Sequence, residues 1–110
     1  MRIAKHLLTA AVAAVVMTTG AAVAMADGAR IFVIGGKADD PFWSKVKKGA
    51  DDAAKVVELN GGTVTWLGPQ NYDNLGPDAA DLIRTALSQS PSAVVGPDWV
   101  PEAMDDAFKA

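Results

Sequence analysis

Three short apolar runs, each ended by one or two glycines, constrain the fold of this chain more than any other feature. They lie at residues 30–36 (RIFVIGG), 63–67 (TVTWL) and 93–95 (AVV), and segments with helical periodicity follow each of them. This alternation predicts an α/β fold in which parallel strands are joined by right-handed crossovers and covered by helices on both faces. The first run is apolar throughout, which is typical of a strand buried on both faces.

The three helical segments have recognisable starts and apolar positions. In the first, Asp40 is placed to cap the free N–H groups, and Pro41 takes the first helical position, where its missing N–H costs nothing. The second opens at residues 76–78 (GPD) and ends at 88–91, and the third starts near Pro101. The apolar positions are Phe42, Val46, Ala50, Ala53, Ala54 and Val57 in the first helix, Ala79, Leu82, Ile83, Ala86 and Leu87 in the second, and Ala103, Met104, Ala107 and Phe108 in the third.

The predicted strands make up only part of a doubly wound (Rossmann-like) sheet. Such a domain normally has five or six strands, whereas three strands would leave the edge at Val94 unpaired and part of the apolar sheet uncovered. The chain stops at Ala110, inside or just after the third helix. We therefore expect residues 27–110 to form a truncated α/β lobe that is marginally stable on its own.

The first 26 residues have the pattern of a secretory signal peptide. Arg2, Lys5 and His6 precede an apolar run, residues 7–17, and the small residues at 24–26 (AMA) resemble a cleavage site before Asp27. A membrane anchor is the alternative, but the run is short for a span of about 20 apolar residues. The pattern therefore predicts export, and a periplasmic location for the mature protein.

Composition excludes several kinds of site. The sequence has no cysteine, and its only histidine, His6, lies in the predicted signal peptide, so histidine triads, cysteine nucleophiles and ordinary zinc sites are excluded from the mature chain. Without Arg2 and Lys5, eight basic residues face thirteen acidic ones, a net charge of −5. This balance gives no electrostatic basis for binding nucleic acid. We expect no catalytic residues, metal site or cofactor.

The turn at residues 39–43 (DDPFW) carries the chemistry of a polyol pocket. A carboxylate such as Asp40 can accept strong hydrogen bonds from sugar hydroxyls, and the rings of Phe42 and Trp43 can cover the apolar face of a sugar. Each residue also has a purely structural alternative: Asp40 as a helix cap, Phe42 in the core, and Asp39 as a solvated turn residue. Trp43 lies one position off the apolar stripe, which favours ligand contact.

Polar and aromatic residues also follow the other two predicted strands. Asp98 and Trp99 come after the third strand, and Gln70 and Asn71 come after the second. The carboxyl ends of parallel strands face the crevice where ligands bind, so these residues are candidates for its lining, with a role in turns as the alternative. Lys45, Lys47 and Lys48 lie within one turn of Asp51 and Asp52 and are expected to form a solvated, ion-paired face.

The order of these segments resembles the N-terminal part of the ribose/galactose-type periplasmic sugar-binding proteins that serve ABC transporters. The resemblance runs from Ile31 to Lys109 and rests on residues 39–43 (DDPFW), 47–50 (KKGA), 67–70 (LGPQ), 82–87 (LIRTAL) and 93–98 (AVVGPD). It implies a protein about three times as long, with two lobes joined by a hinge. It also implies that Asp40 bonds sugar hydroxyls and that Phe42 and Trp43 pack on the ring. The tryptophan, where pentose binders have a second phenylalanine, hints at a larger or differently shaped ligand.

The resemblance implies a solute-binding component of a sugar ABC transporter, which closes its two lobes around a monosaccharide or related polyol. Its expected partners are the sugar, the membrane permease and a chemoreceptor, with no nucleic acid, and Asp40, Phe42, Trp43 and Asp98 are its expected ligand-binding residues here. Lacking a second lobe, the 110-residue chain should bind sugar very weakly. The alternatives are an exported carbohydrate-modifying α/β enzyme and a cytoplasmic regulator of the lactose-repressor type, against which the export signal argues.

Overall fold

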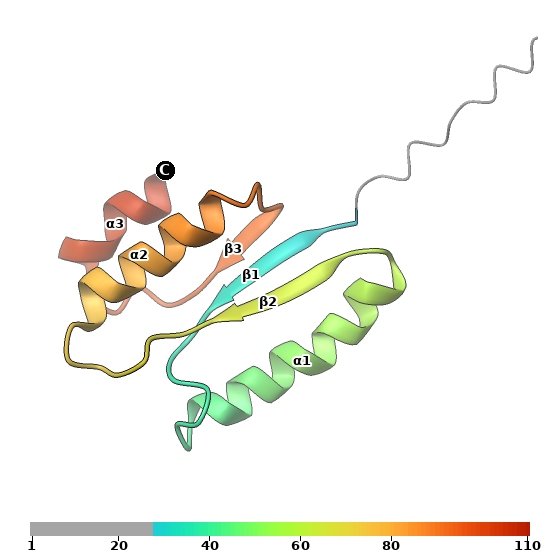
Figure 1. Ribbon diagram of the computed structural model, residues 1–110, viewed down its shortest axis with the longest axis horizontal. Coiled ribbons are helices and arrows are strands. Elements are labelled where there is room, and N and C mark those ends of the chain that lie inside the picture. The colour runs from blue at the N-terminus through green and yellow to red at the C-terminus, as the bar shows by residue number, and fades with distance from the viewer. Residues whose placement is uncertain (1–27) are drawn as a thin grey trace, which may run out of the picture.

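The computed structural model describes residues 28–110, and the predicted signal peptide with its cleavage site before Asp27 lies outside this range. The described residues form a small α/β structure with a three-stranded, parallel, open sheet and three helices (Figure 1). This arrangement is compatible with part of a Rossmann-like fold, as the sequence pattern predicts. The elements are β1 (Arg30–Ile34), α1 (Trp43–Leu59), β2 (Thr63–Leu67), α2 (Leu75–Leu87), β3 (Ala93–Val95) and α3 (Pro101–Lys109).

The strand order is β2-β1-β3, so β1 lies at the centre of the sheet. Ile31 of β1 pairs with Val64 of β2 on one side and with Ala93 of β3 on the other. The chain first steps outward from β1 to β2 and then crosses back over β1 to reach β3. Because right-handed crossovers in opposite directions place their helices on opposite faces, α1 covers one face and α2 the other, with α3 beside α2 (Figure 1).

The hydrophobic core lies between the sheet and the pair of helices α2 and α3. Phe32 and Ile34 of β1 point into it, only 2% and 1% exposed. Small residues on α2 allow this helix to approach the sheet closely, and Ile83 and Met104 fill the remaining space. The buried core residues are Phe32, Ile34, Ala79, Ala80, Ile83, Ala86, Met104 and Ala107.

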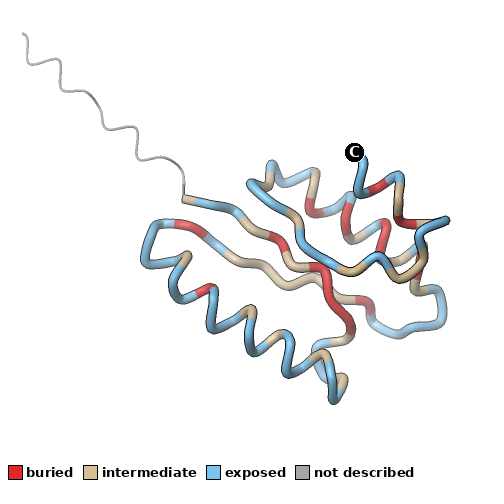
Figure 2. The backbone as a smooth tube through the Cα atoms, turned by 180° about the vertical axis from the view of Figure 1, so that it is seen from behind, coloured by how far each residue is buried: buried red, intermediate tan, exposed pale blue. Residues whose placement is uncertain are grey.

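The opposite face of the sheet is only partly covered, and here the sequence-based expectation was wrong. The strand β1 was expected to be buried on both faces, yet Ile31 and Val33 are half-buried. The helix α1 packs over β2 and leaves this face of β1 and β3 open, so that Val95 is 56% exposed. Figure 2 shows the same asymmetry, since buried residues gather in β1, α2 and α3 while α1 is mostly exposed.

The apolar positions of α1 are accordingly less buried than their spacing predicts. Ala54 is the one buried residue of the helix, whereas Phe42 is 64% and Val46 38% exposed. Because α1 packs mainly on the outer strand β2, it contacts too few sheet residues to bury its whole apolar stripe. In α3, Phe108 is likewise 38% exposed.

The two outer strands, β2 and β3, each have one edge without a strand partner among residues 28–110. For β3 this is the edge at Val94 that the sequence predicted to be unpaired. Within the same residues, no helix has both the length and the apolar character needed to cross a bilayer.

Candidate functional site

The turn between β1 and α1 is held by the side chain of Asp40, as the sequence predicts. Asp40 Oδ1 accepts hydrogen bonds from the backbone N–H groups of Phe42 (2.8 Å) and Trp43 (3.1 Å), and its backbone oxygen accepts from Ser44 N–H (2.8 Å). Asp40 thus bonds free N–H groups at the beginning of the helix, as a cap does, but α1 begins at Trp43, two residues later than the first helical position predicted at Pro41. The N–H groups of Trp43 and Phe42 lower the pKa of Asp40 below its ordinary value.

The second oxygen of Asp40 is bound by a residue that the sequence analysis did not single out. The hydroxyl of Tyr72 donates to Asp40 Oδ2 at 3.2 Å and accepts from the backbone N–H of Lys37 at 3.0 Å. Tyr72 lies in the loop between β2 and α2, so this pair of hydrogen bonds ties that loop to the β1–α1 turn. No local sequence signal marks such a contact, because it joins two loops that are distant along the chain.

Four aromatic rings form a cluster at the carboxyl end of the sheet, with Trp43 at its centre. The Trp43 ring meets Phe42 at a centroid distance of 5.2 Å and Trp99 at 5.4 Å, both in edge-to-face geometry, and Trp66 at 6.3 Å in a tilted arrangement. We call Phe42, Trp43, Trp66 and Trp99 the aromatic cluster. Trp43 is therefore half-buried by other aromatic rings, whereas Phe42 is the most exposed ring of the four.

Two glycines at the end of β1 make room for this cluster. A Cβ atom on Gly35 would collide with the six-membered ring of Trp66, and a Cβ atom on Gly36 would collide with the pyrrole ring of Trp43. Both glycines are buried. The Gly35-Gly36 pair that closes the first apolar run is thus required by close approach of two indole rings.

The aromatic cluster lies at the point where the topology of the sheet reverses. The strands β1 and β3 are neighbours, but the connections that follow them lead to helices on opposite faces of the sheet, α1 and α3 respectively. In open α/β sheets, the crevice outside the carboxyl ends of such strands is where ligands bind. Trp43 comes from the connection after β1 and Trp99 from the connection after β3, so their contact spans this position.

Asp98, the fourth ligand-binding residue expected from the sequence, is exposed and lies beside carboxylates of α3. Loss of hydration raises its pKa above the ordinary value, and a hydrogen bond with Asp105 and the negative charges of Asp105 and Glu102 raise it further. The structure brings Asp40, Phe42 and Trp43 together in one turn. The side chain of Asp98 instead has the carboxylates of α3 as its neighbours.

A cavity lies beside the aromatic cluster, on the side of β2. It has a volume of about 560 Å³ and shares only Trp66 with the cluster. Gln70 lines this cavity as the sequence suggested for a crevice residue, but Asn71 instead accepts a hydrogen bond from Asp73 N–H within its own turn. The cavity is lined by Lys37, Ala38, Asp39, Lys47, Trp66, Gly68, Pro69 and Gln70.

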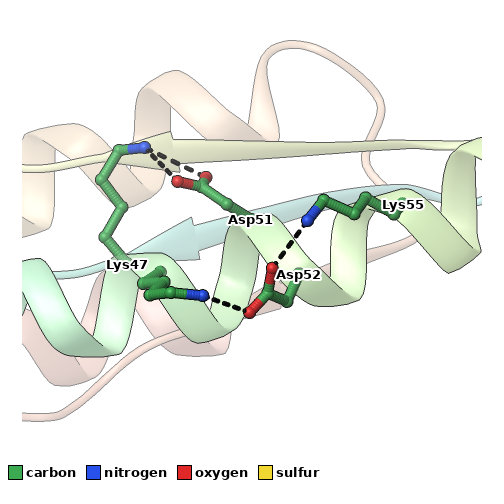
Figure 3. A network of polar contacts seen from close by, with 5 residues as sticks. Lys47, Asp51, Asp52 and Lys55 are labelled. Carbon is green, nitrogen blue, oxygen red and sulfur yellow. Dashed lines mark hydrogen bonds and ion pairs between the residues drawn. The ribbon is translucent and has the colours of Figure 1, made fainter.

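The charged residues of α1 form the ion-paired face that their spacing predicts (Figure 3). Lys47 pairs with Asp51 at 2.8 Å, and Asp52 pairs with both Lys48 and Lys55 at 2.8 Å. Hydrogen bonds from the two lysines lower the pKa of Asp52 to about 2. Within residues 28–110, no group of acidic or histidine side chains is arranged to hold a metal ion.

Comparison of the chain with protein-family models, with curated proteins and with solved structures found no match.

Proposed function

We propose that this chain contributes one wall of a binding site for a monosaccharide or related polyol, at the carboxyl ends of β1 and β3. The observation that carries the proposal is the edge-to-face contact of Trp43 with Trp99 at the topological switch point of the sheet, with Asp40 and Phe42 in the same turn. A sugar needs flat apolar surfaces for its C–H faces and directional acceptors for its hydroxyls, and this turn offers both.

The exposed ring of Phe42 is the most accessible apolar surface of the cluster. Trp43 and Trp99 fix the position of the cluster, because edge-to-face contacts restrict the rotation of each ring. Binding to a surface that is already ordered costs little conformational entropy. A small ligand that makes only a few contacts can therefore bind there.

Asp40 retains acceptor capacity for a sugar hydroxyl. An ionised carboxylate offers about four acceptor positions, and three are taken by the N–H groups of Phe42 and Trp43 and by the hydroxyl of Tyr72. The remaining position is on Oδ2, which Tyr72 alone contacts. The lowered pKa keeps this carboxylate ionised at neutral pH, and charge-assisted bonds to hydroxyls are about twice as strong as neutral ones.

The protein in this proposal is the solute-binding component of a sugar ABC transporter, exported to the periplasm, and the chain performs no catalysis. The support for this wider assignment is the resemblance of residues 31–109 to the ribose/galactose-type sugar-binding proteins. In such a receptor a second lobe contacts the other side of the sugar, and the closed form engages the membrane permease. A single wall should bind a monosaccharide with a Kd of about 1–10 mM.

Nuclear magnetic resonance tests the proposal on the 110-residue chain itself. A panel of neutral hexoses and pentoses is titrated against the ¹⁵N-labelled chain while the indole N–H resonances of Trp43 and Trp99 are followed. At least one sugar should shift both resonances in a saturable manner. Trp99→Leu should abolish saturation, whereas Phe108→Leu, which removes a partly exposed ring from α3 outside the cluster, should leave it unchanged.

Two results would contradict the proposal. The first is the absence of any saturable shift at Trp43 and Trp99 across the panel at concentrations of about 50 mM, well above the expected Kd. The second is equal sugar affinity of the Trp99→Leu and Phe108→Leu variants.

A further inference from the structure

The cavity beside Trp66 is separate from the proposed sugar site and has a different chemical character. Its volume of about 560 Å³ lies within the range of small-molecule pockets. It contains none of Asp40, Phe42, Trp43 or Trp99 among its lining residues, and it opens on the β2 side of the aromatic cluster. Two of its eight lining residues are lysines from different elements: Lys37 from the turn after β1 and Lys47 from α1.

The side chains of these two lysines are less exposed than those of Lys48 and Lys55, the other ion-paired lysines near them. The side chains of Lys37 and Lys47 are 36% and 32% exposed, whereas those of Lys48 and Lys55 are 75% and 73% exposed. In Figure 3 the side chain of Lys47 extends away from the helix axis, toward the carboxylate of Asp51. Two partly buried lysines therefore line one cavity.

The acidic partners of these two lysines are more exposed than the lysines themselves. Asp39 is the one carboxylate among the lining residues, and its side chain is 81% exposed and 3.6 Å from Lys37. Asp51, the partner of Lys47, is 57% exposed and lies outside the lining. Exposed ion pairs of this kind contribute little to stability, so a lysine can exchange its partner for a bound anion at small cost.

The indole of Trp66 supplies a flat apolar surface to the same cavity. Its Nε1–H group is buried and has no hydrogen-bond partner among the described residues. A Cβ atom on Gly68, itself a lining residue, would lie 3.2 Å from this nitrogen, so a side chain at this position would crowd the indole. The amide of Gln70 adds an exposed donor and acceptor at the rim.

We propose that this cavity is a second binding site and that it takes a small ring compound carrying one carboxylate. The carboxylate would lie between Lys37 and Lys47, where charge-assisted hydrogen bonds favour an anion over a neutral group. The ring would lie against Trp66, as rings do on aromatic faces. Sugar acids and aromatic acids share this chemistry, and the two sources differ in whether the ring is a polyol.

Four probes in matched pairs test the proposal on the 110-residue chain: glucuronate against glucose, and benzoate against benzyl alcohol. The indole N–H resonance of Trp66 is followed by nuclear magnetic resonance, and that of Trp99 reports separately on the proposed sugar site. At least one carboxylate should shift Trp66 in a saturable manner and bind about tenfold more tightly than its neutral partner. A response to glucuronate alone identifies a sugar acid, and a response to benzoate alone identifies an aromatic acid.

Lysine variants locate the anion. Lys47→Met and Lys37→Met should each weaken binding of the carboxylate about fivefold or more, because each removes one charge-assisted contact. Lys48→Met, on the same helix but outside the cavity, should leave the affinity unchanged. A neutral sugar that saturates the proposed sugar site should still shift Trp43 and Trp99 in all three variants, so failure of one site is distinguishable from failure of the other.

Three outcomes would overturn the proposal: no saturable shift of Trp66 with either carboxylate, equal affinity for a carboxylate and its neutral partner, or equal effects of Lys47→Met and Lys48→Met. The use of two cavity lysines guards against a variant that fails to fold.

Discussion

The indole rings of Trp43 and Trp99 meet edge to face with their centroids 5.4 Å apart, and this contact joins the connections that follow β1 and β3. Trp43 also contacts Phe42 and Trp66, so one ring links three others across the carboxyl end of the sheet. A displacement of Trp43 should therefore alter the whole aromatic cluster, and with it the proposed sugar site.

Gly36→Ala should displace Trp43, because the new Cβ would collide with its pyrrole ring. We expect a loss of about 1–3 kcal/mol in the free energy of unfolding and a weaker near-ultraviolet circular dichroism signal from tryptophan. Gly49→Ala is the matched control: Gly49 lies within α1, with open space around the site of a Cβ, so this change should stabilise the chain by about 0.5–1 kcal/mol. Equal effects of the two substitutions would contradict the assigned role of Gly36.

Tyr72→Phe removes the hydroxyl that joins Lys37 to Asp40 while keeping the ring. The backbone N–H of Lys37 should then exchange with solvent faster, because its acceptor is lost, and the free energy of unfolding should fall by about 0.5–1.5 kcal/mol. The N–H of Thr63, which donates to Ala29 in the sheet, serves as the reference amide in hydrogen-exchange measurements. An unchanged exchange rate at Lys37 would show that the hydroxyl does not hold this loop.

Asp52→Asn and Asp98→Asn should shift stability in opposite directions. The folded-state pKa of Asp52 is lowered to about 2, so its contribution is present above the ordinary value of 3.8 and is lost as the pH falls from about 4 to 2. Asp52→Asn should therefore lower the Tm at pH 7, with a difference that shrinks below pH 4.

The folded-state pKa of Asp98 is raised, so the folded state binds this proton more strongly than the unfolded chain does. Stability is then lost as the pH rises above the ordinary value of 3.8, and Asp98→Asn should raise the Tm at pH 7 but leave it nearly unchanged at pH 3. Thermal melts of both variants and the parent chain across this pH range check the two signs. Shifts of the same sign at pH 7 would contradict the assigned environments.

Ile83→Ala should reveal how far stability depends on the α2–α3 side of the sheet. Ile83 is 1% exposed within the core, so its truncation should cost about 2–5 kcal/mol in urea-induced unfolding. Leu59→Ala, at a position 87% exposed near the end of α1, should change the free energy of unfolding by less than about 0.5 kcal/mol. A similar loss of unfolding free energy in both variants would contradict the position of the core between the sheet and the helices α2 and α3.

Local sequence signals predicted the order of the elements, and they predicted the start of α1 to within two residues. The Asp40 cap and Pro41 were readable because capping depends on residues within one turn, and Thr63–Leu67 and Ala93–Val95 match the predicted strands residue for residue. Periodicity also predicted three of the buried residues of α2, Ala79, Ile83 and Ala86, but it missed Ala80, and Leu82 and Leu87 are only partly buried.

What the sequence did not predict depends on contacts between distant segments. The apolar stripe of α1 predicts which face of the helix turns toward the sheet. It does not predict that the helix packs mainly on β2 and leaves Phe42 exposed. The contacts of Trp66 with Gly35 and of Tyr72 with Asp40 join parts of the chain whose proximity follows only from the strand order β2-β1-β3. The burial of Trp43 by Trp66 and Trp99 could not be predicted either, because these residues are distant from it along the chain.

The position of a bound monosaccharide tests the central claim most directly. A crystal structure of the protein in complex with a sugar selected by titration should show the sugar ring within about 4 Å of the aromatic cluster, with a hydroxyl hydrogen-bonded to Asp40 Oδ2. A sugar bound at another surface, with Asp40, Phe42, Trp43 and Trp99 making no contact to it, would contradict the account.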